Sequence, residues 1–127
     1  MRLFRHYTDL PDDARGAVVA IGNFDGIHRG HQAIIGEAGR VAQAGGRRLA
    51  VLTFEPHPRQ VFQPGAPPYR RTPLRIKTRN IEELGVDDLF VLHFDEALAA
   101  IGAEDFVMEV LVRGLAASHV VVGYNFS

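Results

Sequence analysis

Two histidines, His28 and His31, stand at the end of a glycine-rich stretch that runs from residue 22 to residue 31 and reads G-N-F-D-G-I-H-R-G-H. The stretch follows a short apolar run and leads directly into a helix-like segment, residues 32–44. Glycines let a backbone pass close to a ligand, and a helix start presents free N–H groups and a positive dipole end. Imidazole donors at the same place can stabilise developing phosphate charge. The stretch therefore predicts a nucleotide-phosphate site.

The spacing of the glycines separates this stretch from the common phosphate loops. Gly22, Gly26 and Gly30 recur at every fourth position, which fits neither G-x-G-x-x-G nor G-x-x-x-x-G-K-[ST], and the stretch contains no lysine. These differences exclude the dehydrogenase and P-loop classes. A zinc site is disfavoured because the chain has no cysteine and no H-E-x-x-H pattern. Two loop histidines without a ligand are the plainer alternative, and the flanking strand, glycines and helix start argue against it.

Composition sets limits on the class of protein. The chain has 127 residues, of which 46% are hydrophobic and 23% charged, so it has the length of about one domain and can bury a core. Its formal net charge of −1 gives no electrostatic reason to bind a nucleic-acid polymer or an anionic membrane. The absence of cysteine excludes disulfides, and neither a secretory segment nor a membrane-length apolar run occurs. We therefore expect a cytoplasmic unit whose partners are small molecules.

Short apolar runs alternate with helix-like segments along the chain. We expect strands over residues 17–22, 47–54, 87–94 and 119–123, and helices over residues 32–44, 73–84 and 103–115. Continuous apolar runs are typical of strands buried on both faces, and repeated β-α-β units give a parallel sheet with helices on both faces. The predicted fold class is therefore α/β, a doubly wound parallel sheet. Ligands of such sheets lie beyond the carboxyl ends of the strands, where the winding direction reverses.

The second predicted strand ends in a stiff motif, F-E-P-H-P at residues 54–58. Pro56 and Pro58 fix their own φ angles and hold His57 between them. A rigid turn of this kind suits a wall against which a planar ring stacks. The plainer alternative is that Phe54 is simply a core residue.

Taken together, the motifs resemble those of the FMN adenylyltransferase module of prokaryotic bifunctional riboflavin kinase/FAD synthetase. The resemblance covers residues 15–127 and rests on G-N-F-D-G-x-H-x-G-H, F-E-P-H-P, R-x-T followed by Lys77, E-E-L-G-V-D at residues 82–87, and G-x-N-F near the end. It implies a Rossmann-like nucleotidyltransferase fold of the HxGH superfamily. It also implies that ATP and FMN react, with Mg²⁺, to give FAD and pyrophosphate.

The resemblance further implies roles for individual residues. The implied catalytic residues are His28, His31 and Asn125: the histidines bind the ATP phosphates and stabilise charge at the α-phosphorus, and Asn125 reaches both substrates. The implied adenylate pocket consists of Gly22, Asn23, Phe24, Asp25, Gly30 and His31. The implied flavin site consists of Phe54, Pro56, His57, Pro58, Phe62 and Asn125. No side chain is assigned to a metal.

The sequence also departs from the family pattern. The R-L-T triplet reads Arg70-Arg71-Thr72, and the sequence stops at Ser127, where the family continues with an R-x-G segment, a strand, an I-S-S-T-x-x-R motif that helps to hold the ATP phosphates, and a riboflavin kinase domain. We therefore expect residues 1–127 to form a partial adenylyltransferase domain whose fold is incomplete at its C-terminal end. Two alternatives stay open: a non-catalytic flavin- or nucleotide-binding fragment, and a nucleotidyltransferase with a non-flavin acceptor.

Overall fold

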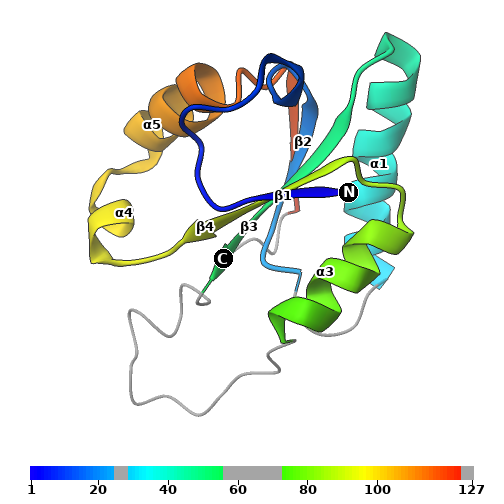
Figure 1. The fold of residues 1–127 in the computed structure, drawn as a ribbon, viewed down its shortest axis with the longest axis horizontal. Coiled ribbons are helices and arrows are strands. Elements are labelled where there is room, and N and C mark those ends of the chain that lie inside the picture. Colours follow the sequence, from blue (N-terminus) through cyan, green and yellow to red (C-terminus); the bar gives the residue numbers. More distant parts are fainter. Residues whose placement is uncertain (25–28, 56–72, 124–127) are drawn as a thin grey trace.

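The computed structural model describes residues 1–24, 29–55 and 73–123, without the side chains of residues 29 and 30. Within these ranges the chain forms one parallel sheet (Figure 1). Its strands are β1 Arg2–Phe4, β2 Val18–Ile21, β3 Leu49–Glu55, β4 Asp88–His93 and β5 His119–Val122. They lie in the order β1-β4-β3-β2-β5.

Helices cover both faces of the sheet (Figure 1). On one face lie α1, Arg29–Gly45, and α3, Leu74–Glu83. On the other face lie α4, Glu96–Ala100, α5, Ala103–Phe106, and the π-helical segment η2, Val107–Gly114, together with the short turn η1, Asp12–Ala14. The α/β class and the helices on both faces are as the sequence predicted.

Alternate residues of the inner strands build two separate cores, because successive side chains of a strand point to opposite faces. In β2, Val19 and Ile21 pack in the cluster that contains Val110 and Leu111 of η2. Their neighbours Val18 and Ala20 pack in the second cluster, whose α1 members are Ile35, Ala38 and Ala42. Each fully buried valine or leucine stabilises the fold by about 1.5–3 kcal/mol relative to exposure. The sheet is therefore held from both sides.

The winding direction reverses between β2 and β5. From β2 the chain passes through α1 to β3 and then through α3 to β4, moving toward one edge of the sheet. It then returns through α4, α5 and η2 to place β5 on the other side of β2. The carboxyl ends of β2 and β5 are therefore the switch point at which such sheets bind ligands.

Several elements differ from the sequence prediction. Strand β1 was not expected, because three residues are too few to show a pattern. Helix α4 was also missed, although Asp95 is a recognisable N-cap whose side chain accepts a hydrogen bond from Leu98 N at 2.8 Å. The helix expected over residues 103–115 starts as α5 and continues as the π-helical η2.

Strand β5 also departs from the expected burial on both faces. It lies at the edge of the sheet, and Val120 and Val122 are 40% and 51% exposed. An apolar run alone does not distinguish an edge strand from an inner one. In the described ranges, none of the helices combines the length and the apolar character that crossing a bilayer requires.

Candidate functional site

The chain stays attached to β3 for two residues beyond the end of β2. Gly22 N donates to the carbonyl oxygen of Leu52 at 3.1 Å. One residue later, the hydroxyl of Thr53 donates to the carbonyl oxygen of Asn23 at 3.2 Å. Thr53 is fully buried, so this hydrogen bond satisfies a polar group inside the fold. The start of the glycine-rich stretch is therefore fixed on β3.

Phe24 adopts a left-handed backbone conformation that bulky residues rarely take. Its φ is +56°, and its side chain is only 5% exposed. The ring lies against Gly22, where an added Cβ would come within 2.9 Å of the ring. Glycine is therefore required at position 22 to make room for the ring of Phe24. Strained backbone of this kind persists where the surrounding structure holds it and is frequent at functional sites.

His31 lies in the first turn of α1, because the helix starts at Arg29, earlier than the sequence predicted. Its ring contacts the ring of Phe24 edge to face, with centroids 5.3 Å apart and planes at 82°. Nδ1 of His31 and Oδ1 of Asn23 are both buried. The structure thus brings together three predicted site residues, with the imidazole held at the positive end of a helix dipole.

A cavity of about 150 Å³ opens beside this imidazole, between α1 and α3. Its lining combines polar and apolar side chains: Phe24, His31, Gln32, Ile35, Lys77, Asn80, Ile81, Glu83 and Leu84. This volume is below the range of roughly 300–1,000 Å³ that holds a whole small-molecule ligand. The described part of the cavity is therefore large enough for only a portion of such a ligand.

Lys77 and Glu55 form a buried ion pair at this edge of the sheet. The lysine side chain is 2% exposed, and its Nζ lies 3.3 Å from Oε1 of Glu55, the last residue of β3. Sequence reasoning noted both residues only as parts of motifs and assigned neither to the site. The available signal was a charged residue at the end of an otherwise apolar strand.

Phe54 lies on the opposite face of the sheet from Phe24. It is 3% exposed and belongs to the core cluster below α5. Its ring contacts Phe94, with centroids 5.8 Å apart, and Phe106, with centroids 6.0 Å apart. Phe54 is therefore placed as a core residue, which was the plainer of the two interpretations of its role. A contact between Phe54 and a flavin stays a prediction.

The end of β5 lies against α1. A Cβ added to Gly123 would overlap the side chain of Ile34, so the helix packs directly on this glycine. Helix α1 thus touches the sheet where β2 and β5 end. Gly30 belongs to the first turn of α1 by its backbone. The remaining predicted site residues lie outside the described residues: Asp25, His28, Pro56, His57, Pro58, Phe62 and Asn125.

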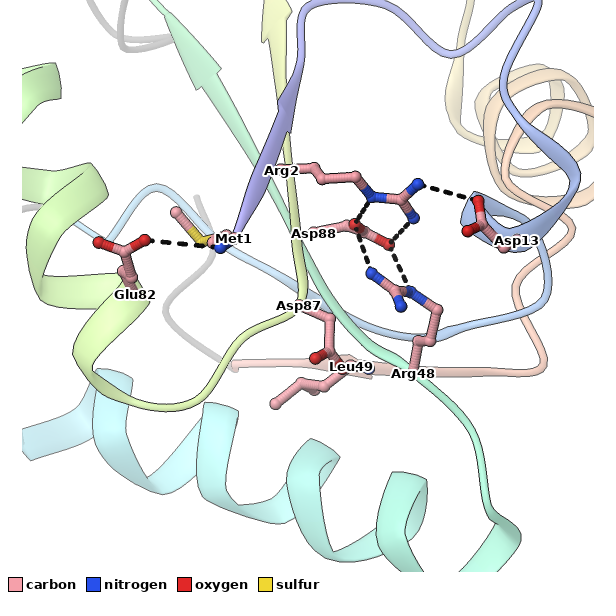
Figure 2. A network of polar contacts seen from close by, with 8 residues as sticks. All are labelled: Met1, Arg2, Asp13, Arg48, Leu49, Glu82, Asp87 and Asp88. Atoms are coloured by element: carbon pink, nitrogen blue, oxygen red, sulfur yellow. Dashed lines mark hydrogen bonds and ion pairs between the residues drawn. The ribbon is translucent and has the colours of Figure 1, made fainter.

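At the amino ends of the strands, a second polar cluster surrounds the fully buried carboxylate of Asp88 (Figure 2). Arg2 donates to it from Nε at 2.8 Å, and Arg48 donates from Nη2 at 3.0 Å. Arg2 also donates to Asp13 at 2.9 Å. Nearby, Leu49 N donates to the Asp87 carboxylate at 2.9 Å. These contacts join β1, β3 and β4 to η1.

The two arginines determine the charge state of Asp88. Burial alone raises the pKa of this carboxyl, but the hydrogen bonds from Arg48 and Arg2 more than offset it, so the pKa lies below its ordinary value of 3.8. The hydrogen bond to Asp88 in turn raises the pKa of each arginine. In this cluster, Asp88 is ionised at neutral pH and its charge is neutralised by the arginines.

Known proteins resemble this chain over most of its length. Bifunctional riboflavin kinase/FMN adenylyltransferase of Bacillus subtilis (strain 168) is 38% identical over 119 residues, which cover 93% of this chain and 37% of the relative. The protein of the same name from Pseudomonas fluorescens is 40% identical over 126 residues, covering 99% of this chain and 40% of the relative. The protein of that name from Escherichia coli (strain K12) is 36% identical over 127 residues, which cover 99% of this chain and 41% of the relative. The chain spans about two-fifths of the length of these relatives.

A solved structure named as a macrolide-efflux protein from Streptococcus pneumoniae shares the fold. Its TM-score is 0.75 at 24% sequence identity, covering 94% of this chain and 40% of that one. The family model described as FAD synthetase matches residues 10–127, which include the glycine-rich stretch at the end of β2, the motif at the end of β3 and β5. With its parallel sheet, its switch point and this match over nearly its whole length, the chain belongs to the FAD synthetase family.

Proposed function

We propose that this protein transfers the AMP group of ATP to FMN, producing FAD and pyrophosphate. The observation that carries the proposal is the match to the FAD synthetase family over residues 10–127. The names of the relatives, which include FMN adenylyltransferase, support the same reaction. Residues 1–127 belong, in this proposal, to the adenylyltransferase domain.

The proposed step is an in-line displacement at phosphorus. A phosphate oxygen of FMN forms a bond to the α-phosphorus of ATP, the bond from that phosphorus to the oxygen bridging to the β-phosphate breaks, and pyrophosphate leaves with the bonding electrons. No group is oxidised or reduced, and no enzyme nucleophile takes part. Catalysis of such a step consists mainly of positioning and of stabilising negative charge.

His31 is the described residue best placed for this chemistry. It lies in the first turn of α1, where free N–H groups and the helix dipole attract an anion. Its ring is held by Phe24, so little reorganisation is needed when charge develops on the phosphates. His28 and Asn125 complete the proposed catalytic set, and both lie outside the described residues.

Magnesium enters this proposal as part of the substrate, MgATP. In the described ranges, no group of three or more His, Cys, Asp or Glu side chains is arranged to hold a metal ion. In this proposal the nucleotide phosphates provide the oxygens that bind Mg²⁺. Bound in this way, the ion neutralises charge on the phosphates.

The flavin is proposed to bind at the ends of β3 and β5, against Pro56, His57, Pro58, Phe62 and Asn125, with Phe54 beneath them. The partners of the protein are accordingly small molecules rather than a nucleic-acid polymer, and the formal net charge of −1 agrees with this choice. We place the reaction in the cytoplasm.

The direct test is product analysis of the protein expressed from its own gene. Incubation with FMN, ATP and Mg²⁺ is expected to give FAD and pyrophosphate, separated by chromatography and identified by mass. Turnover with a non-flavin phosphate and none with FMN would assign the fold to another nucleotidyltransferase. Binding of flavin or nucleotide without pyrophosphate release would reduce the protein to a binding module.

A further inference from the structure

The ion pair of Lys77 and Glu55 has no part in the mechanism proposed so far. Lys77 is among the largest fully buried side chains of the fold, and Glu55 has 16% of its side chain exposed. Two charges removed from water pay a desolvation penalty that their mutual attraction often only balances. A buried ion pair is therefore weak evidence for a stabilising role, and its position suggests another one.

The pair joins the end of β3 to the first part of α3. Glu55 is the last residue of β3, and its carbonyl oxygen accepts a hydrogen bond from Phe94 N at 2.9 Å. Lys77 lies in the first turn of α3, where its N–H donates to the carbonyl oxygen of Pro73 at 2.9 Å. Residues 56–72, which include most of the predicted flavin contacts, connect these two points in the sequence. The ion pair is a direct side-chain contact between the two elements that border this segment.

Lys77 also faces the cavity that His31 lines. Both side chains belong to its wall, together with Phe24. A single buried contact thus links the end of the strand that precedes the flavin motif with the cavity beside the proposed phosphate-binding histidine. Displacing reacting groups by about 1 Å can reduce a rate on the order of 10²-fold. Loss of a contact at this place is therefore expected to change the kinetics of the reaction.

We propose that Lys77 and Glu55 form a positioning pair that sets the place of FMN relative to His31. Neither residue needs to touch the flavin: Lys77 holds the Glu55 carboxylate and, with it, the chain position from which residues 56–58 depart. This inference rests on the proposed function, since it assigns a role within the same reaction.

The experiment compares substitutions in the protein expressed from its own gene. Lys77→Met retains the length of the side chain and removes its charge, and Glu55→Gln retains an acceptor and removes the charge on the other partner. The exchanged pair Lys77→Glu with Glu55→Lys restores attraction in reverse. Arg40→Met serves as the matched control, because Arg40 forms an exposed ion pair with Glu37 on α1, away from the described cavity lining. KM for FMN, KM for ATP, kcat and the melting temperature are measured for each.

We expect Lys77→Met and Glu55→Gln each to raise KM for FMN on the order of 10-fold, with KM for ATP changed far less. A double variant that combines Lys77→Met with Glu55→Gln should be no worse than the poorer single variant, since each substitution already breaks the same contact. The exchanged pair should recover part of the loss. Equal changes in both KM values, additive effects, or a lowered melting temperature with wild-type kinetics would overturn the proposal. If wild-type protein forms no FAD at all, the proposed function itself fails.

Discussion

At the amino ends of the strands, two arginines neutralise the buried carboxylate of Asp88 (Figure 2). At the carboxyl ends, the imidazole of His31 is held by the ring of Phe24. The backbone differs as well. Phe24, next to His31, takes a left-handed φ of +56°. Around Asp88, by contrast, β1, β4 and β3 pair in regular parallel register. At the amino ends, charged side chains neutralise one another, whereas at the carboxyl ends a strained residue and a histidine lie beside a cavity.

With the proposed function, this difference assigns stability to one end of the strands and activity to the other. A buried carboxylate with two charged donors is costly to disrupt but offers nothing to a ligand. In our proposal, the histidine at the start of α1, beside a strained neighbour, serves to bind an anion. Substitutions at the two ends of the strands should therefore produce different readouts.

The largest expected effect is on catalysis. Replacing His31 with alanine should lower kcat on the order of 10²-fold or more, because one preorganised donor to developing phosphate charge is lost. The affinity for FMN should change much less. Steady-state kinetics of FAD formation measure both. His6→Ala, at an exposed position, is the control. A variant at position 31 with wild-type kcat and weakened FMN binding would contradict the assigned role.

At the amino ends of the strands, Asp88→Asn should act on stability instead. It removes the charge that both Arg2 and Arg48 neutralise, and we expect a loss of roughly 2–3 kcal/mol in the free energy of unfolding, below the full cost of breaking a buried pair because the arginines are partly exposed. Urea denaturation measures the loss. Asp13→Asn, at a side chain that is 65% exposed, should cost less than about 1 kcal/mol. A large decrease in kcat for folded Asp88→Asn protein would contradict the assignment of stability to one end of the strands and activity to the other.

Gly22→Ala tests the contact that supports His31. The new Cβ would lie 2.9 Å from the ring of Phe24, so the ring must move, and the imidazole packed on it moves too. We expect kcat to fall about 10-fold, and the displaced buried ring should also lower the melting temperature. Gly36→Ala on α1, where an added Cβ meets nothing within 4 Å, is the matched control and should leave kcat unchanged. Equal kinetics for the two variants would show that Phe24 does not orient His31.

The smallest expected effect is on the melting temperature at low pH. The pKa of Asp88 is lower in the folded protein than its ordinary value of 3.8, so its contribution to stability is fully present above that value and is lost as pH falls through the lower folded pKa. The melting temperature of the wild type should therefore decrease below about pH 4 more steeply than that of Asp88→Asn. Thermal melts across this range measure the slope. If the melting temperatures of the two proteins fall in parallel as the pH is lowered, Asp88 is not the source of the acid sensitivity.

The inner strands could be predicted because each is a continuous apolar run, and the switch point followed from their alternation with helices. Which strand lies at an edge could not be read locally, since β5 looks like an inner strand until its neighbours are known. The backbone of Phe24 was equally hidden, because a left-handed φ at a bulky residue arises from packing against Gly22 and His31. The contact between Lys77 and Glu55 depends on how α3 crosses the sheet, which no short window of sequence contains.

The arrangement of the edge strands has a consequence for the order of folding. β2, β3 and β4 pair with their neighbours in the sequence, whereas β1 pairs with β4 and β5 pairs with β2 across much longer stretches of chain. Closing a long loop costs chain entropy before any contact repays it. The three inner strands with α1 are thus the natural nucleus, and both outer strands join late. The switch point is completed by one of these late strands, so the proposed phosphate site forms only when nearly the whole described sheet has folded.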